Sequence, residues 1–215
     1  MSEKAVVQAI GRGLWEGVQT RRFHQASDIL DVLIAAVCLV LTIPLLMACA
    51  ILIRRADGGP VFFTQVRLGK DGVPFRMYKL RTMCVDAEAR TGGIWAQEND
   101  PRVLPRCRWM RISHVDELPQ LINVLKGHMA IVGPRPEREE ILVQLEEMYP
   151  AIRERLAVLP GITGLAQIRD GYDTTALGFS DKLSSDLEYI RRKGIAFDLG
   201  ILFRTLPCIC DRQAR

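Results

Sequence analysis

Hydrophobic residues are concentrated in one long segment near the start of the chain. From Val32 to Ile53 the sequence runs for 22 residues without a charge. A helix of this length reaches about 33 Å at roughly 1.5 Å per residue, which is enough to cross the hydrocarbon core of a bilayer. The segment is followed by the charged pair Arg54-Arg55 rather than by a small-residue cleavage site. It therefore predicts a membrane anchor and not a cleaved signal peptide.

A proline within this segment leaves its topology open. Pro44 removes one backbone hydrogen bond and bends a helix, and Thr42 can reinforce the bend by bonding to a preceding carbonyl. Basic pairs flank both ends, Arg21-Arg22 before and Arg54-Arg55 after. Because cations favour the cytoplasmic side of a membrane, the two flanks do not choose an orientation. On the residues alone, a spanning helix and a re-entrant helix-break-helix are equal alternatives.

The pattern after the anchor predicts a β-hairpin and several helices. Val61–Arg67 and Pro74–Thr82 alternate as strands do, with turn residues between them. Helical spacing predicts helices at 136–149 and 181–192 and a further amphipathic element at 195–206. We therefore predict an α+β fold, in which a membrane helix precedes a compact, mainly helical domain with a small hairpin and amphipathic interfacial helices.

These patterns divide the chain into three parts. Residues 1–27 are expected to form a tail or an interfacial helix, 28–55 the membrane anchor, and 56–215 one compact domain. The polar, glycine-containing stretch 84–100 predicts a mobile loop. With 215 residues, 48% of them hydrophobic, the chain is long enough for one domain and an anchor but is not a multi-span carrier.

Charge and cysteine content narrow the functional classes only a little. The net charge of +4 is spread along the chain, which suits either a generic basic surface or a partner that bears phosphates, whether a lipid headgroup or a nucleotide. We expect no nucleic-acid partner. The six cysteines have no disulfide or zinc spacing, so we expect free thiols in a reducing cytoplasm. The sequence contains no Walker loop, Rossmann glycine motif or Gly-x-Ser-x-Gly motif.

Two adjacent carboxylates are the strongest candidates for chemistry. Asp116 and Glu117 precede Pro119, which is favoured in the first turn of a helix. A helix start favours anions, so we expect Asp116 to be ionised, as a carboxylate nucleophile must be. The alternative is structural: Ser113 and Asp116 would form a capping-box-like pair. The residues alone favour capping over catalysis.

Cations must assist if Asp116 attacks a charged substrate. Two like unit charges 4 Å apart repel by about 4 kcal/mol at an effective dielectric near 20. A divalent cation and arginines would offset this repulsion, and Glu117 could hold the metal or tune Asp116. Lys79 and Arg81 share one face of the second predicted strand, where they could clamp a phosphate or merely protect a strand edge. Arg111 and Arg135 are the other candidates.

Six motifs, in this order and spacing, resemble those of the bacterial sugar transferases that are monotopic phosphoglycosyl transferases. The resemblance extends from about Asp28 to Pro207. The motifs are Gly59-Pro-Val-Phe-Phe-Thr-Gln65, Phe75-Arg-Met-Tyr-Lys79-Leu-Arg81-Thr-Met83, Asp116-Glu-Leu-Pro-Gln120, Asn123-Val-Leu-Lys-Gly127, Val132-Gly-Pro-Arg-Pro136 and Pro160-Gly-Ile-Thr-Gly164.

The resemblance implies a membrane enzyme that uses magnesium. Its anchor would be a re-entrant helix-break-helix in the cytoplasmic leaflet of the bacterial inner membrane, with the break at Thr42 and Pro44 and the catalytic domain on the cytoplasmic face. Asp116 would attack the β-phosphate of a UDP-sugar and expel UMP. Polyprenol (undecaprenyl) phosphate would then take the phosphosugar, which would initiate exopolysaccharide, O-antigen or related glycan assembly. The short N-terminus is expected to mark the small form that has only the catalytic domain.

The resemblance also implies roles for individual residues. Asp116 and Glu117 would be catalytic and would hold Mg²⁺, while cationic residues would bind the substrate phosphates or nucleotide: Lys79, Arg81, Arg111, Arg135 and Arg169.

Some positions depart from the usual pattern of these transferases. Ile43 replaces a frequent serine, His114 and His128 replace other residues, and the sequence after Gln167 differs, which bears on Arg169. These departures keep one alternative open, a catalytically inactive, membrane-anchored adaptor that binds a nucleotide or a lipid phosphate. The sugar, the glycan, contact with downstream glycosyltransferases and the oligomeric state are not determined by the sequence.

Overall fold

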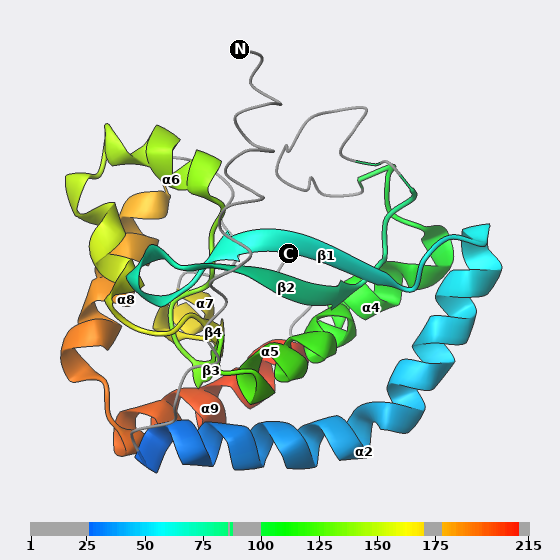
Figure 1. Ribbon diagram of the computed structural model, residues 1–215, viewed down its shortest axis with the longest axis horizontal. Coiled ribbons are helices and arrows are strands. Elements are labelled where there is room, and N and C mark those ends of the chain that lie inside the picture. The colour runs from blue at the N-terminus through cyan, green and yellow to red at the C-terminus, as the bar shows by residue number, and fades with distance from the viewer. Residues whose placement is uncertain (1–25, 86, 88–99, 170–177, 211–215) are drawn as a thin grey trace.

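The computed structural model of the protein describes residues 26–85, 87, 100–169 and 178–210. The predicted N-terminal tail or interfacial helix and most of the predicted loop at 84–100 lie outside these residues. The described elements form an α+β fold that is mostly helical, with two small sheets (Figure 1). The predicted α+β, mainly helical class with a small hairpin is therefore confirmed.

The apolar segment forms one long helix, α2 (Ala26–Asp57). By length and composition it could cross a membrane, and most of its large apolar side chains are exposed. The predicted break into two helices is not confirmed, because α2 remains helical through Pro44. The helix does change direction part-way along (Figure 1). The predicted bond of Thr42 is confirmed, since its hydroxyl donates to the Cys38 carbonyl at 2.7 Å.

The predicted β-hairpin is present. Strands β1 (Phe62–Leu68) and β2 (Pro74–Leu80) pair antiparallel, with Phe63 opposite Lys79. The turn between them is the 3-10 helix η2 (Lys70–Gly72). It needs positive φ at Asp71 (57°) and Gly72 (74°), which aspartate tolerates and glycine favours.

A second, parallel sheet was not predicted from the sequence. It pairs β3 (Ala130–Val132) with β4 (Gly161–Thr163). Glycine is required where the two segments meet, because a Cβ on Gly161 would lie 2.1 Å from the backbone nitrogen of Gly133. This close approach fixes where the chain leaves β3 toward Arg135.

The remaining described elements are short helices and two longer ones that surround the sheets. In chain order they are η3 (Pro105–Cys107), α4 (Arg108–Ile112), η4 (Val115–Gln120), α5 (Leu121–Leu125), α6 (Glu139–Glu146), η5 (Pro150–Ala157), α7 (Leu165–Arg169), α8 (Phe179–Arg192) and α9 (Ile195–Cys210).

Helices α8 and α9 confirm the predicted elements at 181–192 and 195–206. The helix expected over 136–149 is shorter in the structure, where α6 starts at Glu139 and ends at Glu146. Leu142 and Leu145 of α6 are buried, whereas Met148, which lies beyond the helix, is 53% exposed.

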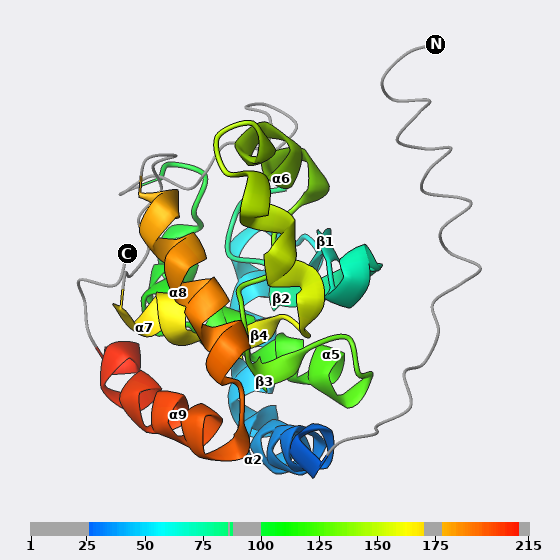
Figure 2. The ribbon, with the colours of Figure 1, turned by 90° about the vertical axis from the view of Figure 1, so that its left-hand side faces the viewer.

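The largest apolar cluster joins the membrane helix to the rest of the fold. Residues from α2, β2, α5, β3 and α9 contribute to it, including Ala35, Met77, Val124, Val132 and Ile201. Figure 2 shows α2 and α9 together at the base of the molecule. The first half of α2 is therefore part of the core as well as the predicted anchor.

Candidate active site

The carboxylate segment adopts a different local structure from the one predicted. Asp116 and Glu117 lie within the 3-10 helix η4, and Pro119 is inside that helix rather than at the start of an α-helix. The predicted helix terminus that would favour an anion is therefore absent from the described segment. The capping alternative is also wrong, because the Ser113 hydroxyl donates backward to the Trp109 carbonyl at 2.8 Å. His114, with φ of 54°, makes the turn into η4.

Glu117 is held by two cations. Lys79 Nζ lies 2.8 Å from Glu117 Oε1, and Arg135 donates to both carboxylate oxygens at 2.6 and 3.1 Å. Only 8% of Glu117 is exposed. Burial alone would raise the pKa of Glu117, but Arg135 and Lys79 hold it well below its usual range. Glu117 is therefore ionised and serves as the common partner of the two cations.

Asp116 has different surroundings, although it is the next residue. It is 7% exposed, and no residue in the described part of the chain hydrogen-bonds to its carboxylate. Burial and the neighbouring charge of Glu117 raise the pKa of Asp116 to about 6, against the opposing effect of Lys79, Arg111 and Arg135. A carboxyl group with this pKa is mostly ionised at neutral pH.

An asparagine fixes the carboxylate segment to the hairpin. Asn123 in α5 is fully buried, and its side-chain amide donates to the Arg76 carbonyl at 2.6 Å and accepts from the Tyr78 backbone N–H at 3.0 Å. These two bonds occupy the edge of β2 immediately before Lys79. The two hydrogen bonds join α5 to β2 just before Lys79, and they thus help to fix the position of Lys79 relative to Glu117.

Arg81 does not pair with Glu117, unlike Lys79. It forms a bidentate ion pair with Asp57 at the end of α2, with distances of 2.6 and 2.5 Å. It also donates to the carbonyls of Pro60 at 2.5 Å and Met83 at 3.1 Å. Lys79 and Arg81 are thus held by different carboxylates. These four hydrogen bonds favour a structural role for Arg81, in which it links the end of α2 to β2.

We expect Arg81→Met to lower stability more than substrate affinity. The substitution leaves Asp57 and two carbonyls without their donor, which should lower the free energy of unfolding by about 2–4 kcal/mol. Thermal unfolding in detergent measures this loss, with the exposed Arg55→Met at the end of α2 as the control. An unchanged melting temperature together with at least tenfold weaker binding of a phosphate-bearing ligand would instead support the predicted phosphate-binding role.

Two further predicted arginines occupy different surroundings. Arg111 in α4 lies near Asp116, whose pKa it lowers, and its Nη1 is 3.4 Å from the Thr82 hydroxyl. Arg169, at the end of α7, pairs with Glu188 of α8, with Nη1 2.5 Å from Oε2. The structure thus brings Arg111 to the carboxylates, whereas the described contact of Arg169 is with α8.

Sequence reasoning missed several residues that build the site. These are Asn123, which lies within one of the motifs, and Asp57, Arg155 and Asp186. Arg155 donates both to Asp186 and to the backbone carbonyl of Arg135. Their residue types carry no distinguishing signal, because each acts through a partner that is distant in the sequence.

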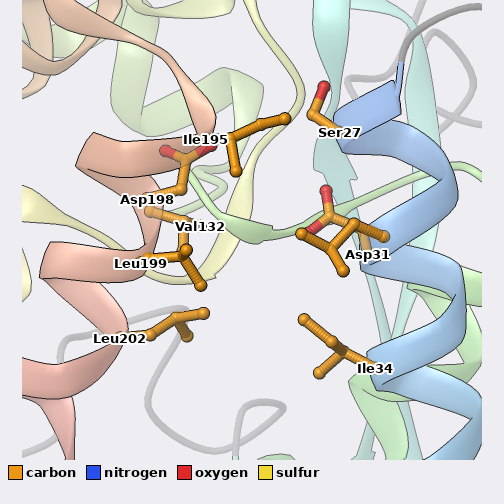
Figure 3. Close-up of a pocket in the computed structure, with 9 residues that line it drawn as sticks. Ser27, Asp31, Ile34, Val132, Ile195, Asp198, Leu199 and Leu202 are labelled. Carbon is orange, nitrogen blue, oxygen red and sulfur yellow. The ribbon is translucent and has the colours of Figure 1, made fainter.

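A small cavity lies away from these groups, between α2 and α9. Figure 3 shows Asp31 and Ile34 on the α2 side and Asp198 and Leu202 on the α9 side. None of the predicted site residues lines it. The candidate active site is therefore the group formed by Asp116, Glu117 and their cations, and not this cavity.

Comparison with known proteins identifies the family of the chain. The model of the bacterial sugar transferase family matches residues 22–212, which include every element described above. The chain belongs to the bacterial sugar transferase family.

Relatives within the family carry names that specify related reactions. A UDP-N-acetylgalactosamine-undecaprenyl-phosphate N-acetylgalactosaminephosphotransferase of Aeromonas hydrophila is 39% identical over 84% of this chain and 42% of its own length. A UDP-glucose:undecaprenyl-phosphate glucose-1-phosphate transferase of Caulobacter vibrioides is 38% identical over 84% of this chain and 68% of its own. An exopolysaccharide production protein of Rhizobium leguminosarum is 36% identical over 82% and 90%. The chain thus spans less than half of the Aeromonas transferase and most of the Rhizobium protein.

Proposed function

We propose that the protein transfers a sugar 1-phosphate from a UDP-sugar to polyprenol phosphate and releases UMP. The observation that carries this proposal is the contrast between the two adjacent carboxylates. Glu117 is ionised and held by Lys79 and Arg135, whereas Asp116 is buried and has no hydrogen-bond partner among the described residues. This arrangement suits a nucleophile beside a fixed cationic cluster, and the names of the family members supply the substrate class.

In the first step, an oxygen of Asp116 attacks the β-phosphorus of the UDP-sugar. The bond from that phosphorus to the bridging oxygen breaks, and UMP leaves with the electron pair. Asp116 then carries the phosphosugar as an acyl phosphate. Lys79, Arg111 and Arg135 reduce the repulsion between Asp116 and the diphosphate, which is about 4 kcal/mol for two unit charges 4 Å apart at a dielectric near 20.

In the second step, a phosphate oxygen of the polyprenol phosphate attacks the same phosphorus. The bond to Asp116 breaks, the carboxylate is regenerated and polyprenyl-diphosphate-sugar is formed. Since the acceptor is also an anion, the same three cations serve both steps. Products of this kind would begin exopolysaccharide or related glycan assembly and pass to downstream glycosyltransferases.

We further propose that the reaction uses Mg²⁺, held by Asp116 and Glu117. The described residues contain no group of three or more carboxylate, histidine or cysteine side chains suited to a metal. Two adjacent carboxylates nevertheless fit Mg²⁺, which usually keeps several waters and binds through one or two carboxylates and the substrate phosphates. When bound, the ion would neutralise charge on the diphosphate. Lys79 and Arg135 would remain bound to Glu117.

The anchor is proposed to be re-entrant, with both its ends at the cytoplasmic face of the bacterial inner membrane. The bend of α2, the Thr42 hydrogen bond beside Pro44 and the basic pairs at both ends support this topology. The exposed apolar residues Ile195, Leu199 and Phe203 of α9 follow one another at helical spacing. They suit a helix that lies in the cytoplasmic leaflet beside α2.

Pro44→Leu should straighten the anchor by restoring the missing backbone hydrogen bond. In intact cells, a cysteine at Ser2, with the native thiols removed, should be protected from an impermeant maleimide when Pro44 is present and labelled in the Pro44→Leu variant. Labelling in the presence of Pro44 would contradict the re-entrant topology.

A panel of UDP-sugars tests the proposed reaction. The purified protein is incubated with each sugar nucleotide, polyprenol phosphate and Mg²⁺, and released UMP is measured. At least one sugar should support UMP release that depends on Mg²⁺. Binding of UDP-sugar without UMP release from any member of the panel would instead indicate an inactive adaptor.

A further inference from the structure

Helix α8 and its neighbours hold the backbone of the segment that carries Arg135. The segment 132–135 is bonded at four consecutive residues, so little freedom remains in its backbone. The bonds run from Tyr189 Oη to Val132 O (2.9 Å), from Gly133 N to Thr163 O (2.8 Å), from Gly161 N to Pro134 O (2.9 Å) and from Arg155 Nη2 to Arg135 O (2.9 Å).

The last of these bonds comes from a buried ion pair. Arg155 in η5 donates from Nη2 and Nε to Asp186 Oδ2 in α8, at 2.7 and 3.1 Å. Their side chains are 5% and 2% exposed. The Arg155 guanidinium also lies 5.5 Å from the centre of the Phe179 ring. Asp186 and Phe179 thus fix the direction in which Arg155 points toward the Arg135 carbonyl.

These contacts form a continuous path from α8 to the reacting carboxylate. Asp186 orients Arg155, Arg155 fixes the backbone of Arg135, and the side chain of Arg135 binds Glu117 beside Asp116. Arg155 is buried, and its guanidinium has five N–H donors that need acceptors. Its third contact is with the backbone of a residue in the site.

We infer that Arg155, oriented by Asp186, is a positioning residue that sets the geometry of the Arg135–Glu117 pair. The inference rests on the proposed function. Loss of the Arg155 contact lets the Arg135 peptide rotate, so that the guanidinium no longer stays in register with Glu117 and the substrate phosphates. Misplacement of a positioning group by about 1 Å can lower the rate about 100-fold.

The variant that tests this role removes both charges together. Arg155→Met with Asp186→Leu leaves no unpaired buried charge, and such apolar replacements usually keep a protein folded. Arg155→Lys is a second variant, which keeps a cation beside Asp186 but lacks the forked group that reaches both partners. Arg153→Met is the matched control, because Arg153 is 41% exposed and pairs with Glu139 and Glu146 on the surface.

A double-mutant cycle with Arg135→Ala separates positioning from stability. With Arg135 present, we expect the charge-free double variant to lower kcat for UMP release about 10- to 100-fold, and Arg153→Met to leave it unchanged. In the Arg135→Ala background the same double substitution should lower kcat less than about twofold, because the residue through which Arg155 acts is gone. An equal loss in both backgrounds would overturn the inference.

Hydrogen–deuterium exchange tests the same path without turnover. The charge-free double variant and Arg155→Lys should both raise exchange in peptides covering 131–137 and 114–120, and leave α5 unchanged. Unchanged exchange at 114–120 in both variants would overturn the inference. If the native protein releases no UMP from any sugar nucleotide while exchange at 114–120 rises in the variants, the proposed function fails and the positioning role stands.

Discussion

Asp116→Asn is expected to lower UMP release at least about 1,000-fold, because the amide cannot form the acyl phosphate. The variant should remain folded and membrane-bound. Burial raises the pKa of Asp116 to about 6 from 3.8. The group is still mostly ionised at pH 7, but its ionised form is less stable in the folded than in the unfolded state, so it lowers the free energy of unfolding at this pH. Removing that charge should leave the melting temperature unchanged or raise it. Steady-state UMP release and thermal unfolding in detergent measure the two effects.

Asp181→Asn is the control for this substitution, because Asp181 is exposed in the first turn of α8. It should change neither the rate nor the melting temperature appreciably. Near-normal turnover by Asp116→Asn would exclude Asp116 as the nucleophile. A sharp fall in its melting temperature would contradict the electrostatic description of the site.

Glu117→Gln should lower both stability and activity, in contrast to Asp116→Asn. The substitution leaves Lys79 and Arg135 close together without the carboxylate that both contact. Breaking one partner of a buried pair costs about 3–5 kcal/mol, and the partial exposure of Arg135 reduces the expected loss to about 2–4 kcal/mol. Thermal unfolding should show this loss, and KM for the sugar nucleotide should rise because Arg135 is displaced.

A surface pair of similar chemistry provides the control for Glu117. Glu139 is 49% exposed and pairs with Arg153, so Glu139→Gln should cost less than about 1 kcal/mol. Combining Glu117→Gln with Lys79→Met should restore part of the lost stability, since only one unpaired cation then remains. A Glu117→Gln variant as stable as Glu139→Gln would show that the two cations do not depend on Glu117.

Elements whose signal is local could be predicted from the sequence. The apolar run of α2, the alternation of β1 and β2 and the helical spacing of α8 and α9 all lie within a few consecutive turns or pleats. The second sheet could not be predicted in this way. Strands β3 and β4 are three residues each and pair in parallel across a long stretch of chain. Only the close approach of Gly133 and Gly161 makes that pairing fit.

The sequence predicted which residues form the candidate site better than it predicted the contacts among them. The motifs pointed to Asp116, Glu117, Lys79 and Arg135, and the structure brings these four together. Which carboxylate holds the cations, and which makes no hydrogen bond to another described residue, depends on tertiary packing, for which adjacent residues give no signal. For the same reason the alternation that placed Arg81 beside Lys79 did not reveal its ion pair with Asp57.

The most direct test of the central claim is intact-protein mass spectrometry after incubation with an active UDP-sugar and Mg²⁺ in the absence of polyprenol phosphate. We predict the release of up to one UMP per chain and a mass increase of one phosphosugar, located on the peptide that contains Asp116 and removed when polyprenol phosphate is added. UMP release only when the acceptor is present, with no adduct on the protein, would contradict the account.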